Sequence, residues 1–198
     1  MGLKLDYIDG QTPIDEGEKE GLLIKTITTQ RELNEHEQLN IESAIQWILQ
    51  KKFKAETILT EEFIKSVHKK MFCNIWSWAG KFRKSEKNIG VEWIKIGIEL
   101  RYLLDDTRYW IDNSTYLPDE IAIRFKHRLV NIHCFPNGNG RHSRIMADII
   151  IESIFAKEVF TWHYSNMVNP DKIRKKYITA IKEGDNGNIN PLISFARN

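Results

Sequence analysis

A short polar segment, residues 133–144, holds the side chains best suited to chemistry; it reads His-Cys-Phe-Pro-Asn-Gly-Asn-Gly-Arg-His-Ser-Arg. Backbone N–H groups in a glycine turn, the positive end of the helix that follows and two arginines together favour a site for a polyphosphate. The candidate phosphate ligands are Gly138, Asn139, Gly140, Arg141 and Arg144. The segment therefore predicts that the chain binds a nucleotide or a related anion.

An ordinary turn between two helices is the alternative interpretation of the same segment. Pro136, Asn137 and Gly138 are common turn residues. A turn alone does not explain why two arginines stand on the first turn of the next helix, so we favour the anion site. The segment is not a P-loop, because Gly-Lys-Ser/Thr is missing, and it is not a Rossmann motif, because no strand precedes the glycines.

His133 ends the apolar stretch that precedes the glycines, five residues before Gly138. A histidine with a pKa near neutrality can accept a proton from a hydroxyl group that attacks phosphorus. A histidine at a helix end is more often structural, and the neighbouring phosphate site is what favours catalysis here. The pair makes transfer of a nucleotide to a hydroxyl group chemically reasonable.

Apolar residues at helical spacing predict the elements that position this segment. A helix opened by Pro118 carries one buried stripe, formed by Ile121, Phe125, Leu129 and Ile132. Further helices are expected over residues 31–50, 60–72 and 93–112, from about 141, from about 170 and from about 191. Strand signals are confined to residues 84–93, which predict a loop with a short hairpin. The expected fold class is all-α, a helical bundle.

Composition predicts one domain in a reducing compartment. The chain has 198 residues, of which 41% are apolar, and we expect residues 1–27 to form an N-terminal arm and residues 28–198 a single domain. No long apolar run or signal sequence is visible, which predicts a soluble cytoplasmic protein without membrane contact. The net charge of +2 argues against nucleic acid as a partner. Two cysteines, Cys73 and Cys134, are too few for a disulfide framework or a four-ligand zinc site.

The segment resembles the signature of the Fic (Fido) family, His-Pro-Phe-x-Asp/Glu-Gly-Asn-Gly-Arg-x-x-Arg, and departs from it only at Cys134 and Asn137. The resemblance extends along the chain to Trp78-Ala79-Gly80 with Arg83, and to Gly187-Asn188-Ile189-Asn190-Pro191-Leu192 with Phe195. Asp9-Gly10-Gln11-Thr12-Pro13 and Glu32-Leu33-Asn34 are similar to the Fic subgroup called mobile mystery protein B. The resemblance implies a Fic-type helical bundle with a small β-hairpin flap.

The resemblance also implies an activity: a protein adenylyltransferase, which moves AMP from ATP to Ser, Thr or Tyr of a target protein. In such an enzyme His133 would be the general base, Phe135 would hold the loop from within the core, and Asn137 would stand at the position of the Mg²⁺ ligand. Residues 84–93 would form the flap that holds the target by strand-like pairing. An ordinary surface hairpin is the alternative for residues 84–93.

Two residues leave alternatives open. Asn137 replaces the usual carboxylate, and a neutral amide oxygen is a weaker ligand for magnesium. The chain could then be an ATP-binding regulator with weak or no catalysis. A Fic enzyme that uses another nucleotide or removes AMP is a further alternative, because the signature fixes the geometry of the phosphates better than the identity of the nucleobase. Glu32 follows Thr29 at the spacing of a capping box, and it also resembles part of the inhibitory motif of Fic proteins; we favour the cap. A homo-oligomer is also left open.

Overall fold

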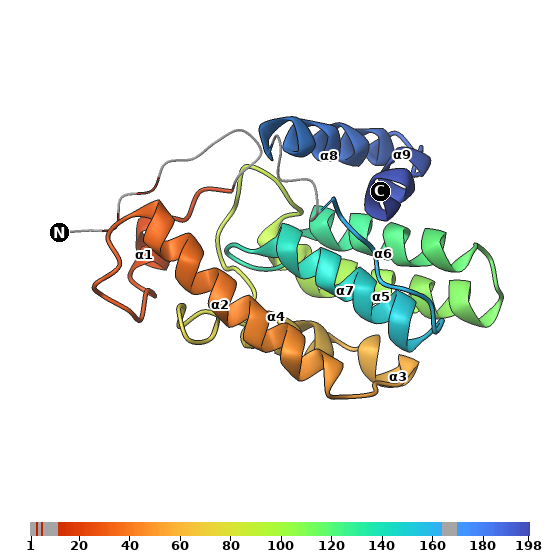
Figure 1. The fold of residues 1–198 in the computed structure, drawn as a ribbon, viewed down its shortest axis with the longest axis horizontal. Helices are drawn as coiled ribbons and strands as arrows, with labels where there is room; N and C mark the ends of the chain where they lie inside the picture. Colours follow the sequence, from red (N-terminus) through yellow and green to blue (C-terminus); the bar gives the residue numbers. More distant parts are fainter. Residues whose placement is uncertain (1–2, 4, 6–11, 164–169) are drawn as a thin grey trace.

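Helices make up almost all the regular structure of this computed structural model, which describes residues 3, 5, 12–163 and 170–198 (Figure 1). The elements are α1 (Glu16–Lys19), α2 (Gln30–Leu49), α3 (Ala55–Ile58), α4 (Glu61–Phe72), the 3-10 turn η1 (Trp93–Lys95), α5 (Ile96–Asp112), α6 (Pro118–Ile132), α7 (Asn139–Ser153), α8 (Pro170–Asp185) and α9 (Asn190–Arg197). The all-α expectation is confirmed.

Three helices begin where their capping residues predict. The Thr29 side chain accepts a hydrogen bond from the backbone N–H of Glu32, and the Glu32 carboxylate accepts one from the N–H of Thr29, which completes the capping box of α2. Thr60 caps α4 by accepting from the N–H of Phe63 at 3.1 Å. Pro118 stands in the first turn of α6, where its missing N–H costs nothing.

The centre of the molecule is the pair α6 and α7, which lie side by side and are joined by the polar segment (Figure 1). Helix α5 packs on α6, and α2 packs on α4. Helix α9 packs on both α8 and α6. The stripe predicted on α6 is buried, with Phe125 at 0% exposure and Ile132 at 5%. The two central helices therefore fix both ends of the polar segment against the core.

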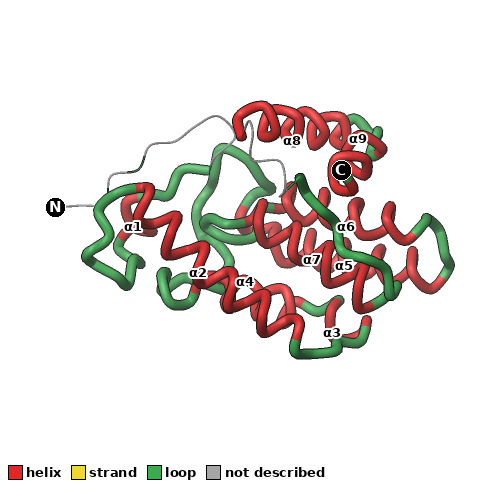
Figure 2. The backbone as a smooth tube through the Cα atoms, in the orientation of Figure 1, coloured by secondary structure: helices red, strands yellow, loops and turns green. Residues whose placement is uncertain are grey.

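The hairpin expected over residues 84–93 is not found; Figure 2 shows a loop there. Within the described residues, strand-type pairing is limited to one isolated bridge between Leu22 and Trp76. The physical reason is that one end of the loop bonds to the polar segment and the other to the last residue of α6, and the two ends do not bond to each other. The N–H of Arg83 donates to the carbonyl of Cys134 at 2.9 Å, and the N–H of Val91 donates to the carbonyl of Ile132 at 3.4 Å.

The described part of the N-terminal arm packs on the domain. Ile14, Leu22 and Ile27 are buried, with exposed fractions of 6%, 5% and 3%. Residues 9–11, which belong to the stretch similar to mobile mystery protein B, lie outside the described residues, and so does Asn169, expected at the start of α8. None of the helices in the described ranges has the length and apolar content that a membrane crossing requires.

Candidate active site

The polar segment turns sharply between α6 and α7 because two of its residues adopt left-handed backbone angles. His133 ends α6 with φ 57°, and Gly138 precedes the first residue of α7 with φ 77°. A Cβ atom at Gly138 would lie 2.5 Å from the ring of Phe72, so no larger residue fits there. A Cβ atom at Gly140 would meet nothing within 4 Å, which leaves open space beside the start of α7.

Asn139 clamps the turn with its side chain. Its Oδ1 accepts from the N–H of Phe135 at 2.9 Å, and its Nδ2 donates to the Phe135 carbonyl at 2.7 Å. Only 4% of Asn139 is exposed. The side chain therefore shapes the loop, and a phosphate would be bound by the backbone N–H groups at the start of α7.

Phe135 is fully buried and connects the loop to the core, in the position expected for a structural residue. Its ring stacks on His68 with 3.7 Å between centroids. His68 accepts from the N–H of Gly80 at Nδ1 and therefore donates from Nε2 to the carbonyl of Asn137, both at 3.0 Å. Burial lowers the pKa of His68 well below its usual value, so the ring is neutral. His68 was not among the predicted site residues, although it lies on the buried stripe of α4.

Arg141 is held by a carboxylate that sequence reasoning missed. Its Nη1 lies 2.7 Å from Oε2 of Glu37 on α2, and the Nε1–H of Trp76 donates to the other carboxylate oxygen at 2.7 Å. Glu37 is 3% exposed, whereas a third of the Arg141 side chain remains exposed. Glu37 therefore orients the guanidinium while part of it still faces outward. A carboxylate within the apolar stripe of α2 was the available signal.

Arg144 lies one turn further along α7 and is placed by a different helix. Its guanidinium carbon is 5.6 Å from the ring centroid of Tyr177 on α8.

The carboxylate of Glu32 is engaged at the start of α2, where it accepts from the N–H groups of Thr28 and Thr29 at 2.9 and 3.0 Å. Glu32 thus acts as the helix cap, and an inhibitory role for it stays a prediction.

The side chain of His133 is a buried neutral imidazole, and its hydrogen bonds show which ring nitrogen carries the hydrogen. Its Nδ1 faces the carbonyl of Val130 at 3.3 Å, an acceptor only, so Nδ1 carries the hydrogen. Nε2 is then the acceptor, and the hydroxyl of Thr12 donates to it at 3.0 Å. Burial, helped by the charges of Arg83 and Lys87, lowers the pKa of His133 to about 4. The side chain is therefore in the basic form at neutral pH.

Arg83 joins this histidine to the loop over residues 84–91, called the flap loop below. Its Nε donates to the carbonyl of His133 at 2.7 Å, its Nη1 to that of Ser85 at 2.9 Å, and its Nη2 to that of Val91. The backbone of Gly90 comes so close that a Cβ there would lie 2.7 Å from Cβ of His133. One guanidinium thus sets the distance between the flap loop and the imidazole.

The side chain of Asn137 is oriented by its neighbours. Its Oδ1 accepts from the N–H of Gly138 at 2.7 Å, and its Nδ2 donates to the carbonyl of Thr12 at 3.0 Å. Among the residues that the structure describes, no group of three His, Cys, Asp or Glu side chains could hold a metal ion. Oδ1 of Asn137 is a neutral oxygen, a weaker ligand for a divalent cation than a carboxylate would be.

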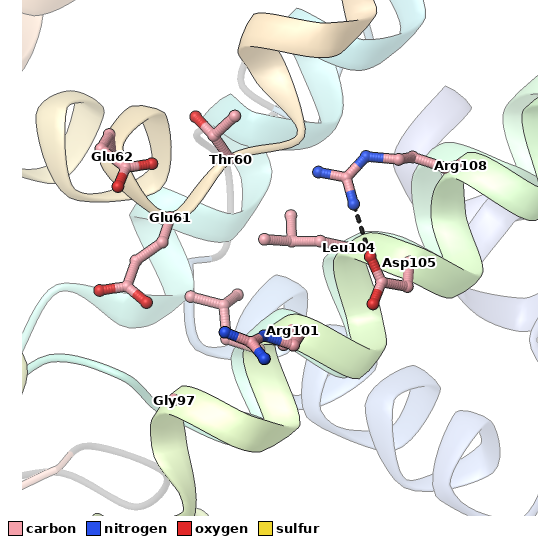
Figure 3. A pocket seen from close by; sticks show the side chains of 9 residues that line it. Thr60, Glu61, Glu62, Gly97, Arg101, Leu104, Asp105 and Arg108 are labelled. Atoms are coloured by element: carbon pink, nitrogen blue, oxygen red, sulfur yellow. Dashed lines mark hydrogen bonds and ion pairs between the residues drawn. The ribbon is translucent and has the colours of Figure 1, made fainter.

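A separate pocket lies between the start of α4 and residues 97–108 of α5 (Figure 3). Its lining mixes the two signs of charge: Glu61 and Glu62 come from α4, while Arg101, Asp105 and Arg108 come from α5. Arg108 donates to Asp105 at 2.6 Å, so these two opposite charges form an ion pair within the pocket. The pocket contains no residue of the segment 133–144 and adds nothing to the chemistry of His133.

Comparison with known proteins connects this geometry to a family. Residues 58–151 match the profile described as the Fic/DOC family. A curated relative, protein adenylyltransferase Fic of Drosophila virilis, is 26% identical over 119 residues, which cover 59% of this chain and 23% of that protein. The chain thus spans about a quarter of the length of this relative.

Solved structures share the fold. BepC, a VirB-translocated effector protein from Bartonella tribocorum with bound AMPPNP, superposes with a TM-score of 0.67 at 16% identity, over 92% of this chain and 97% of that chain. A Fic domain containing signaling protein from Bacteroides thetaiotaomicron gives a TM-score of 0.65 at 17% identity, over 80% of this chain and 66% of that one. At such identities the likeness establishes the arrangement of helices.

Proposed function

We propose that the chain is a protein adenylyltransferase that transfers AMP from ATP to a Ser, Thr or Tyr hydroxyl of a target protein, on the basis of the match between residues 58–151 and the Fic/DOC family profile. One observation carries the proposal: the basic nitrogen of His133 and the open start of α7 flank the same short turn. The curated relatives named protein adenylyltransferase Fic support it.

The triphosphate would bind at the start of α7. Backbone N–H groups of residues 138–140 would hold the α- and β-phosphates, and Arg141 and Arg144 would bind the β- and γ-phosphates. Phe135 and the Asn139 clamp keep these N–H groups in place before the nucleotide arrives. Such preorganised donors are the main source of catalysis in phosphoryl-type transfer.

The reaction needs one proton acceptor and one leaving group. The target hydroxyl oxygen attacks the α-phosphorus, its proton passes to Nε2 of His133, and the bond from the α-phosphorus to the bridging oxygen breaks, which releases pyrophosphate. The hydrogen bond from Nδ1 to Val130 fixes the tautomer that leaves Nε2 able to accept. Magnesium bound to the phosphates would offset their charge, with Oδ1 of Asn137 as its ligand from the chain.

A labelling assay tests the proposal. The purified chain, ATP labelled at the α-phosphate, magnesium and a cell lysate should give labelled protein bands, and His133→Ala should remove them. His36→Ala, on the outer part of α2, is the matched control and should label normally. Bands that persist at full intensity in His133→Ala would show that this histidine is not the base.

A second candidate function is an ATP-binding regulator with little catalysis, and the environment of Asn137 favours it. The amide oxygen is neutral and already accepts the N–H of Gly138, so it competes poorly for magnesium. This function predicts ATP binding by calorimetry without turnover, and labelling that appears in Asn137→Asp. Competition among ATP, UTP and other nucleotides tests whether the same fold uses a different donor, and loss of AMP from a labelled protein tests the reverse reaction.

We also keep three finer assignments as proposals. The two cysteines are free, in keeping with a cytoplasmic location. Residues 28–198 are proposed to fold as one domain without nucleic acid as a partner, and membership of the mobile mystery protein B subgroup rests on the sequence similarity alone. Chemical labelling of Cys73 in intact cells reports its redox state, because this thiol is partly exposed.

A further inference from the structure

A hydroxyl group of the chain itself stands where a target hydroxyl would have to stand. Oγ1 of Thr12 is 3.0 Å from Nε2 of His133, within the range that proton transfer to a general base requires. The contact joins residues 121 positions apart and is buried. Because the histidine has its lone pair at Nε2, the Thr12 hydroxyl donates, which is the arrangement of a nucleophile about to lose its proton.

The backbone around Thr12 is held on both sides. The carbonyl of Thr12 accepts from Nδ2 of Asn137 at 3.0 Å, on the loop that would bind the nucleotide. The carbonyl of Pro13 accepts from Nζ of Lys87 at 3.2 Å, on the flap loop. Ile14, the next residue, is buried with 6% exposure. Residues 12–14 are thus held between the loop of residues 133–138 and the flap loop.

Charged contacts extend this binding along the arm. Nζ of Lys87 lies 2.9 Å from the carboxylate of Asp15 and 2.6 Å from that of Glu18, and the Lys87 side chain is only 2% exposed. The hydroxyl of Ser85 donates to Asp15 at 3.1 Å. The ammonium of Lys87 is buried between a half-exposed Asp15 and a mostly buried Glu18, and this pairing favours one register of the arm on the flap loop.

We propose that residues 12–18 occupy the position of a target peptide and that Thr12 is a site of AMP transfer by the chain's own His133. The proposal rests on the proposed function. A purely structural hydroxyl that satisfies a buried imidazole is the alternative. The register set by Lys87 and Asn137 favours the acceptor role, because it fixes the peptide on both sides of the hydroxyl.

The chemical step is balanced with ATP as the only co-substrate. Oγ1 of Thr12 bonds to the α-phosphorus, its proton moves to Nε2 of His133, and pyrophosphate leaves with the bridging oxygen. The product is a phosphodiester between threonine and adenosine. Thr12 is only 8% exposed, so the groups that cover its hydroxyl must make room for the α-phosphate of ATP before transfer.

The test uses the intact chain, ATP and magnesium, with the modified residue located by mass spectrometry of a digest. AMP is expected on the peptide that contains Thr12. Thr12→Val keeps the branched shape without the hydroxyl and should lower self-labelling at least tenfold, whereas Thr12→Ser should keep it. Thr115→Ala, an exposed threonine between α5 and α6, is the matched control. Transfer within one molecule predicts a rate constant that does not change on dilution.

The outcomes separate this inference from the proposed function. Labelled lysate proteins together with an unmodified Thr12 would overturn the inference and leave the proposed function standing. AMP on other residues of the chain, or self-labelling whose rate constant rises with concentration, would also overturn it. Absence of label from both the lysate and the chain would contradict the proposed function itself. The ATP affinity of Thr12→Val, measured by calorimetry, should equal that of the original chain if this variant keeps its nucleotide site.

Discussion

Arg83 donates from Nε to the carbonyl oxygen of His133 at 2.7 Å, across 50 positions of sequence. The same guanidinium binds the carbonyls of Ser85 and Val91, so it sets both the end of α6 and the flap loop. We predict that Arg83→Lys lowers the rate of AMP transfer by roughly 100-fold, because one ammonium group cannot reach all three carbonyls and a displaced imidazole reacts slowly.

The matched control for Arg83→Lys is Arg31→Lys, a change at an exposed arginine on α2 that should not affect the rate. The initial rate of labelling with α-labelled ATP checks both variants. Thermal unfolding of Arg83→Lys must show a folded protein at the assay temperature. A folded Arg83→Lys variant with the rate of the original chain would mean that the position of His133 does not depend on this guanidinium.

Glu37 lies 2.7 Å from Nη1 of Arg141 and partly neutralises a cation expected to bind phosphate. Glu37→Gln keeps an oxygen for the N–H of Trp76 but removes the charge. We predict that it tightens ATP binding at least about fivefold, since a unit charge at this range is worth about 1 kcal/mol even in water and more at a buried site such as that of Glu37. Calorimetric titration with ATP measures the change.

Glu35→Gln, which removes an exposed charge on the same helix, is the control for Glu37→Gln and should leave ATP affinity unchanged. Weaker binding in Glu37→Gln would show that orientation of Arg141 by the carboxylate matters more than the charge it cancels. Unchanged ATP binding in Glu37→Gln would mean that Arg141 does not bind the phosphates.

The sequence predicted the elements whose stability is local. Helix α6 has a regular apolar stripe and a proline in its first turn, and α2 and α4 begin at threonine caps, so their positions followed from neighbours within four residues. Helices α1 and α3 have four residues each, too few to show a period, and they were not predicted. Helix α7 begins at Asn139 and not near Arg141, because the clamp to Phe135 extends it.

The contacts that shape the site come from residues distant in sequence, and these were missed. Thr12 meets His133 across 121 positions, and Glu37 meets Arg141 across 104. The arm has no periodicity that would place it on the loop. The hairpin predicted for the flap loop was wrong for the same reason. The conformation of this loop is set by Arg83, whose partners include the carbonyl of His133.

His133 should make stability depend on pH in a defined direction. Burial lowers its pKa to about 4 from the 6.5 of an unfolded chain, so the unfolded state binds more protons between these values. The contribution is complete above pH 6.5, falls with pH through this window and amounts to something on the order of 3 kcal/mol. Asp148, whose pKa burial raises to about 7, acts in the opposite direction.

A comparison with His133→Gln isolates the contribution of His133 from that of Asp148. Gln retains groups that can hydrogen bond to Thr12 and Val130 but does not titrate. Denaturant unfolding should show that the free energy of unfolding falls further from about pH 5 to about pH 7 in His133→Gln than in the original chain, because the opposing rise from His133 is gone and the fall from Asp148 remains. Equal differences in the two proteins would mean that His133 is protonated as easily in the folded chain as in the unfolded one.

Lys126 on α6 is fully buried, and its Nζ has no hydrogen-bond partner in the described residues. It lies 4.5 Å from the ring centroid of Tyr177, and burial, followed by the charge of Arg144, holds its pKa well below the usual value. We predict that Lys126→Met, of similar length and apolar, raises the free energy of unfolding by about 1 to 3 kcal/mol near neutral pH.

The stability gained in Lys126→Met should depend on pH. A lysine whose pKa is lowered on folding binds more protons in the unfolded chain, so the stability of the original protein rises with pH up to about 10.4. The advantage of Lys126→Met should therefore be largest near pH 7 and shrink toward about pH 10, as denaturant unfolding would measure. Lys52→Met, at an exposed position, should give no such gain. A loss of stability in Lys126→Met at neutral pH would show that the amine makes a favourable contact that outweighs its burial.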